Sequence, residues 1–253
     1  MAKSSVERIG TGVPGLDPLI GGGIPRGFSA LITGYAGTGK TVMALQMLTC
    51  MAAAGEKCLY LTFEESVEKL VAQAESFSWN IDKIFGKSLK LASLKDYTKD
   101  QGSLIEMISS DVRDGVTVLA VDSLSMLTGA AYLLRSNASK DLALVSDERD
   151  FVLTSEDVRR EHITSLIKDV SSLGVTSIWI AEAHPSIENV LTITTDGVSE
   201  YQCDGVIFLE KRPDGSRRLY IEKMRLTKTE DKPYHMYFID EGIGVNPMGV
   251  RQG

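Results

Sequence analysis

The segment from Gly34 to Thr41, GYAGTGKT, combines three glycines with a lysine and a threonine hydroxyl. It fits the pattern G-x-x-x-x-G-K-[ST] at every position and stands between an apolar run at 28–34 and a helical pattern at 41–54. Glycines let the backbone fold closely around a phosphate chain with its N–H groups pointing inward, and the N-terminus of the following helix adds positive potential. The sequence therefore predicts a P-loop that binds a nucleotide.

Two side chains of this loop are expected to have roles of their own. Lys40 should reach the β- and γ-phosphates, and the Thr41 hydroxyl should coordinate Mg²⁺. A glycine-rich turn that merely precedes a helix is the alternative, and the place of the motif between a strand and a helix argues against it. The predicted nucleotide contacts are Gly34, Tyr35, Ala36, Gly37, Thr38, Gly39, Lys40, Thr41 and Val42.

A carboxylate that could serve the metal ion follows a later apolar run. The segment VLAVDS ends a predicted buried strand in Asp122, where a carboxylate would hold the water shell of Mg²⁺. An aspartate at a strand end is otherwise often a turn or cap residue, and the P-loop is what favours the metal role. We therefore expect ATP and Mg²⁺ as cofactors, with Thr41 and Asp122 at the metal and Asp122 also in the nucleotide site.

Hydrolysis requires a group that orients or deprotonates the attacking water. Many P-loop ATPases carry a glutamate directly after the aspartate, but Ser123 stands there in this chain. The candidates are Glu64 and Glu65 in YLTFEES, because the strand after the P-loop helix can end beside the γ-phosphate. The alternative is that both glutamates begin the next helix, where negative charge suits the helix dipole. We predict that at least one is catalytic and favour Glu64.

The elements that must position these residues are visible as alternating apolar runs and helical patterns. The runs are near-continuous, as expected of parallel strands covered on both faces. Gly55, Gly115 and Gly174 are expected to end three of the helices. The predicted strands are 28–34, 57–65, 116–123 and 176–183, and the predicted helices are 41–54, 66–78, 101–114 and 155–173. This order predicts an α/β fold with a mostly parallel central sheet flanked by helices.

The alternation of apolar runs with helical patterns ends near residue 200. The segments DGVIFLEK, RRLYIEKMR and PYHMYFIDEGIGV have strand-like patterns, and RPDGSR is typical of a hairpin turn. We interpret them as an antiparallel extension of the same sheet, which makes residues 1–253 a single domain. The segment 128–153 has no clear period, which is typical of a functional or partly disordered stretch.

Composition narrows the class of protein. Of 253 residues, 43% are hydrophobic and 24% charged, which is typical of globular proteins. The net charge of −7 argues against a protein whose whole surface binds nucleic acid, and leaves a local basic groove open. The three cysteines, which form no C-x-x-C pair, are interpreted as reduced and buried. The sequence contains no run of 18 apolar residues. We therefore expect a cytoplasmic protein that has no membrane as a partner.

Taken together, the motifs resemble one family. The order TGVPGLDPLIGGGIPRG, GYAGTGKT, YLTFEES, LAVDSLS, VRREHI, CDGVIFL and EKMR is similar to the KaiC-like branch of the RecA-type P-loop ATPases, from about Gly10 to Val245. The resemblance implies a RecA-like fold and self-assembly into a hexamer or filament, with ATP held between subunits. It also matches the paired glutamates of the family to Glu64 and Glu65.

The resemblance assigns a further pair of residues. Lys223 and Arg225 match the K-x-R element of the family, which implies that they reach the γ-phosphate of a neighbouring subunit. Strand alternation places both on one face of RLYIEKMR, so both can point at one target. The alternative is a basic, solvated edge strand.

One departure concerns phosphorylation. The strongest self-kinase members of the family carry adjacent serine and threonine residues where this chain has Ser199 followed by Glu200. A two-site phosphorylation cycle is therefore not expected, while weak autokinase activity stays open. The stretch 184–202 corresponds to a loop that faces the central channel in RecA-like proteins, and its low positive charge does not support DNA binding there.

Three functions remain open from the sequence. The first is a Mg²⁺-dependent, KaiC-like ATPase whose nucleotide cycle drives binding of a protein partner. The second is an ATP-dependent, single-stranded-DNA-binding recombination mediator resembling archaeal RadA paralogues, for which net charge and the lack of an aromatic stacking platform are unfavourable. The third is a nucleotide-loaded scaffold, against which the glutamate pair counts. The DNA hypothesis depends on the hairpin EKRPDGSRR, with Lys211, Arg212, Arg217 and Arg218.

Overall fold

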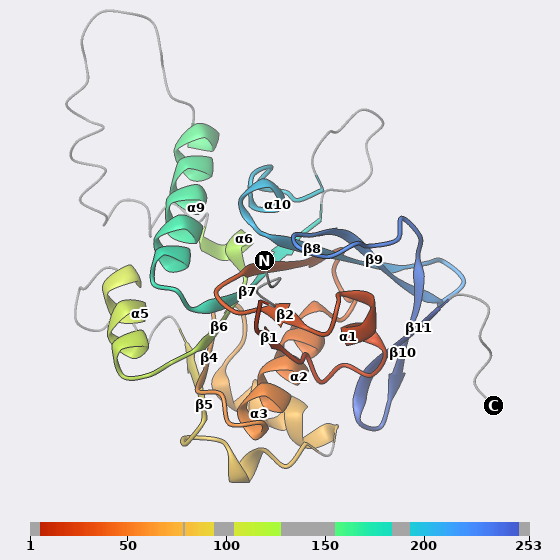
Figure 1. Ribbon diagram of the computed structural model, residues 1–253, viewed down its shortest axis with the longest axis horizontal. Coiled ribbons are helices and arrows are strands. Elements are labelled where there is room, and N and C mark those ends of the chain that lie inside the picture. The colour runs from red at the N-terminus through yellow and green to blue at the C-terminus, as the bar shows by residue number, and fades with distance from the viewer. Residues whose placement is uncertain (1–5, 78, 94–103, 128–154, 184–192, 248–253) are drawn as a thin grey trace, which may run out of the picture.

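The computed structural model describes residues 6–77, 79–93, 104–127, 155–183 and 193–247, which form a nine-stranded sheet, a two-stranded sheet and flanking helices (Figure 1). The strand order in the large sheet is β11-β10-β9-β8-β3-β7-β6-β4-β5. Its strands are β3 (Ser29–Gly34), β4 (Cys58–Thr62), β5 (Leu89–Ser93), β6 (Val118–Asp122), β7 (Thr176–Glu182), β8 (Gly205–Lys211), β9 (Arg217–Met224), β10 (Tyr234–Ile239) and β11 (Gly242–Pro247). The small sheet pairs β1 (Arg8–Ile9) with β2 (Ile24–Pro25).

Helices cover both faces of the parallel part of the large sheet (Figure 1). The helices are α1 (Leu16–Leu19), α2 (Lys40–Ala53), α3 (Val67–Ser76), η1 (Ile81–Lys83), α5 (Leu104–Arg113), α6 (Leu124–Leu127), α9 (Ser155–Ser172) and α10 (Ser199–Gln202). Side chains of α1, α2 and α3 share one hydrophobic cluster with one face of the strands, and those of α5 and α9 share a second cluster with the other face. Burial on both faces explains the continuous apolar runs of the strands.

The four predicted strands and four predicted helices are present, although the second strand is shorter than predicted because it ends at Thr62. The three predicted cap glycines, Gly55, Gly115 and Gly174, have positive φ angles of 104°, 102° and 73°. Sequence analysis missed β5, a five-residue edge strand in which exposed Lys90 interrupts the apolar run. The segment predicted to be irregular, 128–153, lies outside the described residues.

The C-terminal strands correct one detail of the prediction. β8 was expected in the antiparallel extension, but it runs parallel to β3, and the antiparallel pairing begins between β8 and β9. The last strand-like segment forms two strands, β10 and β11, joined by a tight turn. The predicted hairpin turn is present between β8 and β9, where the Asp214 carboxylate accepts hydrogen bonds from the backbone N–H and hydroxyl of Ser216.

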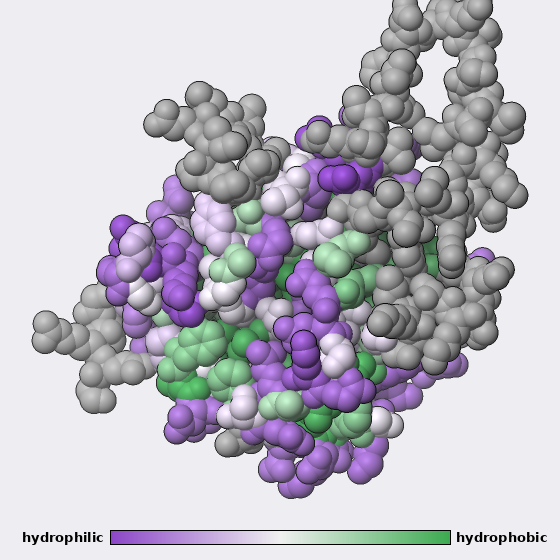
Figure 2. All heavy atoms as spheres, turned by 180° about the vertical axis from the view of Figure 1, so that it is seen from behind, coloured by the Kyte–Doolittle hydropathy of each residue, from purple (hydrophilic) through white to green (hydrophobic). Residues whose placement is uncertain are grey.

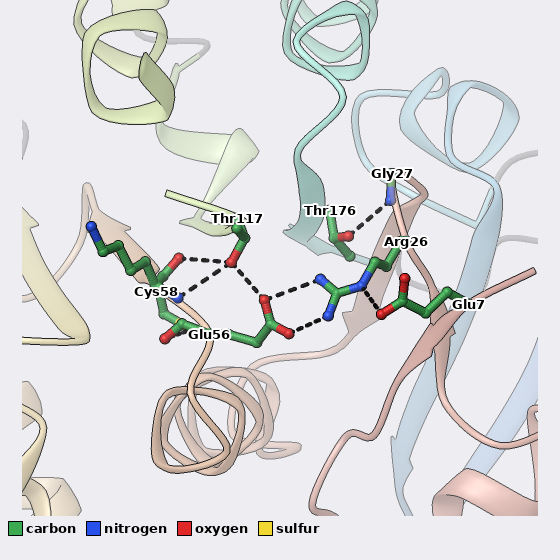
Figure 3. Close-up of polar contacts among 8 residues, drawn as sticks. Glu7, Arg26, Gly27, Glu56, Cys58, Thr117 and Thr176 are labelled. Carbon is green, nitrogen blue, oxygen red and sulfur yellow. Dashed lines mark hydrogen bonds and ion pairs between the residues drawn. The ribbon is translucent and has the colours of Figure 1, made fainter. Parts of the chain in front are cut away.

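An ion-pair network ties the N-terminal segment to the amino-terminal edge of the sheet (Figure 3). The Arg26 guanidinium donates to Glu7 (Nε to Oε1, 2.7 Å) and to both carboxylate oxygens of Glu56, including Nη1 to Oε2 at 3.1 Å. The Thr117 hydroxyl also donates to Glu56, at 2.7 Å. These contacts, the Arg26 hydrogen bonds above all, lower the pKa of Glu56. A bidentate arginine–carboxylate pair holds a fixed geometry, so the network fixes the segment that leads from α2 into β4.

The face of the described residues that is turned away in Figure 1 carries both hydrophilic and hydrophobic side chains. Figure 2 shows the two kinds side by side on this face, with several hydrophobic residues adjoining one another in its lower part. Single exposed hydrophobic residues are ordinary in globular proteins. None of the described helices combines the length and the apolar character that a membrane crossing requires. The large hydrophobic side chains that are exposed are Val6, Phe85, Met126, Tyr201, Leu226 and Phe238.

Candidate active site

The parallel strands bring the predicted site residues to one edge of the sheet. β3, β7, β6 and β4 pair side by side in the same direction, so their carboxyl ends lie together. In the register of these strands, Gly34 is opposite Glu182 and Asp122 is opposite Thr62. The crevice beyond the carboxyl ends of such strands is where open α/β sheets bind ligands.

The P-loop joins β3 to α2 with almost no room for side chains at two of its glycines. A Cβ atom on Gly34 would lie 2.3 Å from the carbonyl oxygen of Leu209, and one on Gly39 would lie 3.1 Å from the Phe238 ring. Gly39 also has a φ of 109°, which disfavours any other residue. The Thr38 hydroxyl closes the loop by donating to the Tyr35 carbonyl at 2.8 Å. At both positions the fold therefore favours glycine over a residue with a side chain.

Lys40 points back across the loop and is almost fully buried, with 7% of its surface exposed. Its Nζ atom donates to the carbonyl oxygens of Gly34 at 2.9 Å and Tyr35 at 3.1 Å, and to Oε1 of Glu182 at 2.9 Å. Glu182 was missed by sequence analysis. The available signal was its position as a carboxylate at the end of the predicted strand 176–183.

Thr41 and Asp122 meet as predicted for the two residues assigned to the metal. The Thr41 hydroxyl donates to Oδ2 of Asp122 at 2.8 Å, and the hydroxyl of Tyr60 donates to the same oxygen at 2.7 Å. Asp122 is only 2% exposed, and this burial raises the pKa of its carboxyl group, while the hydrogen bonds from Tyr60 and Thr41 act against the rise. Tyr60 was not predicted as part of the site.

This set of donors fits a magnesium ion held together with a nucleotide. Mg²⁺ is usually bound through one or two carboxylates plus substrate phosphates, with several waters retained, rather than by a cage of protein ligands. Thr41, at the start of α2, provides a hydroxyl, and Asp122, at the end of β6, provides a carboxylate. Within the described residues no group of three or more histidine, cysteine, aspartate or glutamate side chains could hold a metal by itself.

The two glutamates lie between β4 and α3 but differ in their contacts. Glu64 accepts a hydrogen bond from the hydroxyl of Ser123, the residue that follows Asp122. Glu65 is held through its backbone, because its N–H and carbonyl both bond the Thr62 hydroxyl at 3.0 Å. Both glutamates precede the helix N-cap, Ser66, rather than lying in the first turn. The Glu64 carboxylate is therefore the one tied to the strand that carries Asp122.

Arg217 faces the P-loop instead of extending the basic surface of the hairpin. Its Nη1 donates to the carbonyl oxygens of Gly37 at 2.8 Å and Thr38 at 3.0 Å. Its guanidinium also lies 4.9 Å from the centre of the Phe238 ring. Arg217 is one of the four hairpin residues on which the DNA hypothesis depends, and its guanidinium contacts the P-loop of its own chain.

Aromatic rings gather beside the P-loop, where the sequence indicated no stacking platform. Phe238 lies against Gly39 and is 40% exposed. It stacks on Phe77 with 6.3 Å between ring centres, and Phe77 stacks on Trp79 at 5.1 Å. Phe77 and Trp79 follow α3 and Phe238 lies in β10, so tertiary packing brings the third ring to the other two.

Lys223 and Arg225 contact the segment at the end of α10. Lys223 Nζ donates to the carbonyl oxygen of Cys203 at 2.5 Å, and Nη1 of Arg225 forms a 2.7 Å ion pair with Asp204. The Arg225 side chain remains 57% exposed. Arg217, at the other end of β9, touches the P-loop, and the six residues from there to Lys223 span about 20 Å of strand. These two cations therefore lie far from the P-loop of their own chain.

Ser199 is fully buried, with 0% of its surface exposed. Its hydroxyl donates to Oδ2 of Asp196 at 2.9 Å, and its backbone N–H donates to Oδ1 at 2.8 Å. The neighbouring Glu200 carboxylate accepts from the Thr194 hydroxyl. The Ser199 hydroxyl thus serves an internal hydrogen-bond network. Of the loop expected to face a channel, residues 184–192 lie outside the described part of the chain.

Comparisons with known proteins agree with this geometry. Residues 9–250 match the family described as the ATPase KaiC. The chain is 29% identical over 98% of its length to the circadian clock oscillator protein KaiC of Thermostichus vulcanus, of which it covers 46%. It is 28% identical to a UPF0273 protein of Thermotoga maritima, covering 98% of this chain and 99% of that one. The chain therefore spans about half the length of the KaiC relative and nearly the whole length of the Thermotoga maritima protein.

A solved structure is similar as well. The crystal structure of a KaiC-like protein from Pyrococcus horikoshii superimposes with a TM-score of 0.76 at 28% sequence identity. The match covers 96% of this chain and all of that one.

Proposed function

The chain belongs to the KaiC family of ATPases and has the RecA-type P-loop fold, and we propose that it binds ATP with Mg²⁺ and hydrolyses it. The observation that carries the proposal is the convergence of four polar residues at the carboxyl edge of the sheet. Lys40 and Thr41 begin α2, Asp122 bonds Thr41 from β6, and Glu64 is tied to the residue after Asp122.

Each side chain has a task that follows from its position. Lys40 would donate to the phosphate oxygens from inside the cradle, and Thr41 and Asp122 would hold Mg²⁺ with its water shell. The ion supplies neutralisation of phosphate charge. Glu64 would orient the attacking water and accept its proton, with Ser123 holding the carboxylate in place.

Release of phosphate from ATP, measured in excess Mg²⁺ and again after chelation with EDTA, tests the reaction. We expect turnover with Mg²⁺ and none with EDTA, because the phosphates would lose the ion that neutralises them. Adding Mg²⁺ back should restore the rate, which controls for damage by the chelator. Turnover that survives EDTA would contradict the metal assignment, and tight ATP binding without any turnover would favour the scaffold interpretation.

We extend the proposal to assembly, with ATP between subunits of a homo-oligomer. Arg225 is exposed, basic and a strand's length from its own P-loop, so it is positioned to act on another subunit rather than on its own site. A cation supplied in trans stabilises charge on the transferring phosphoryl group. Its ion pair with Asp204 would hold it in place until a neighbour docks.

Replacing Arg225 by alanine should leave ATP binding intact and lower hydrolysis, because the substitution leaves the mutant's own P-loop unchanged. Mixing this variant with Lys40→Ala subunits should then restore part of the activity, since some interfaces join a working P-loop to a working Arg225. The recovery should rise with protein concentration as assembly does. Phosphate release and light scattering on the same mixtures measure both quantities. Mixed oligomers that form without regaining activity would remove the support for a trans role.

A further inference from the structure

The ammonium group of Lys40 has no hydrogen-bond donor to spare. It carries three N–H donors, and the protein itself accepts three hydrogen bonds, through the carbonyls of Gly34 and Tyr35 and the carboxylate of Glu182. The Lys40 side chain is 8% exposed, so solvent contributes little. Any phosphate oxygen that approaches Lys40 must therefore replace one of these partners.

Glu182 is the partner that can leave. The two carbonyls belong to the backbone of the P-loop, which the β3 ladder and the Thr38 hydrogen bond hold in place. The Glu182 side chain is 35% exposed at the end of β7, and its position on the strand is fixed separately by a bond from its backbone N–H to the Ser125 hydroxyl. Its carboxylate can thus rotate towards solvent without moving the strand.

We propose that Glu182 sets the affinity for nucleotide by competing with phosphate for Lys40. This inference rests on the proposed nucleotide site and adds a residue to it. In the nucleotide-free protein the carboxylate compensates a buried cation, which would be costly to leave unpaired. The same negative charge opposes a phosphate chain that needs the same cation, because two anions then share one site.

Glu182 is thus expected to stabilise the nucleotide-free protein but to oppose nucleotide binding. These opposite effects distinguish it from a contact that is purely structural. Removing the charge of Glu182 should lower the stability of the nucleotide-free protein and raise its affinity for nucleotide. A contact that only stabilised the fold would, when removed, leave binding unchanged or weaken it.

The experiment uses Glu182→Gln, which keeps the shape of the side chain and removes its charge. Calorimetric titration with ADP and Mg²⁺ avoids turnover during the measurement. We expect the dissociation constant to fall about fivefold. This factor corresponds to about 1 kcal/mol, the free energy of a partly exposed ion pair. The unfolding temperature without nucleotide should fall by about 2–4 °C, the shift typical for that loss in a chain of this size.

A matched control comes from the opposite edge of the sheet. Glu56 also forms an ion pair, with Arg26 (Figure 3), but it precedes the amino end of β4, whereas the P-loop follows the carboxyl end of β3. Glu56→Gln should lower the unfolding temperature and leave ADP affinity unchanged. Glu182→Asp, whose carboxylate is one methylene shorter and reaches Lys40 less well, should bind ADP with an affinity between wild type and Glu182→Gln.

The outcomes distinguish this inference from the proposal on which it rests. Suppose that wild type binds ADP and that Glu182→Gln binds it equally well or more weakly. Then the inferred competition between Glu182 and phosphate is wrong, while the proposed nucleotide site remains supported. If wild type does not bind ADP at all, both are wrong. Tighter binding in Glu56→Gln as well would point to a general effect of charge and would also overturn the inference.

Discussion

Replacing Lys40 by alanine is expected to weaken the binding of ATP and ADP severely. The ammonium is the cation buried within the phosphate cradle, where it is 7% exposed and bonded to the loop carbonyls. The donor that Glu182 releases makes one charge-assisted hydrogen bond to phosphate, which contributes about 1.5–3 kcal/mol, so affinity should fall by at least about tenfold. The substitution also leaves the Glu182 carboxylate without its cation in the path of the phosphates, which adds repulsion.

Titration calorimetry with each nucleotide measures this loss directly. Lys90→Ala is a suitable control, because Lys90 is 53% exposed on β5 and pairs with Asp111. It should bind nucleotide as wild type does. Circular dichroism should show that both variants are folded. If Lys40→Ala keeps its affinity within about threefold of wild type, roughly 0.7 kcal/mol, the assignment of the P-loop as the phosphate site is wrong.

Substitution of Glu64 by glutamine is expected to preserve ATP binding and remove most hydrolysis. The amide has the same shape and can still accept the hydrogen bond from Ser123, but it cannot take a proton from water. General-base catalysis typically contributes 10²–10⁴-fold, so the turnover number at saturating ATP should fall by at least about a hundredfold. Phosphate release at saturation gives this number, and ATP binding is measured separately.

Glu65→Gln provides the matched comparison within the same loop. Because Glu65 is held through its backbone by Thr62, and not through contact of its carboxylate with the Asp122 strand, its loss should reduce turnover much less. The reverse result, with Glu65→Gln the damaging change, would exchange the two roles. Full activity in both variants would mean that neither glutamate activates the water.

Local patterns in the sequence were sufficient to predict most of the parallel core. Continuous apolar runs marked β3, β4, β6 and β7 because a strand buried on both faces has no polar positions to interrupt it. β5 was not predicted because it is a short edge strand that carries an exposed lysine. The direction of β8 was wrong because an apolar run does not show which neighbour a strand pairs with, or in which direction.

The P-loop, Asp122 and Glu64 could be selected from sequence as candidates, because a motif, a strand end and a loop position each contain their own signal. The contact between Thr41 and Asp122 agrees with their joint assignment to the metal ion. These predictions depend on residues close in sequence or on the general rule that carboxyl ends of parallel strands share an edge.

Only the tertiary structure decided which side chains surround the phosphate loop. Lys40 and Glu182 are 142 residues apart, and Arg217 meets the loop from 180 residues away. Tyr60 bonds Asp122 across the pair of neighbouring strands β4 and β6. Such contacts are set by strand order, register and the turn of the β8–β9 hairpin, which no short segment specifies. The P-loop motif and the parallel fold around it thus followed from the sequence, while the packing of distant strands determined which charges and rings lie beside the loop.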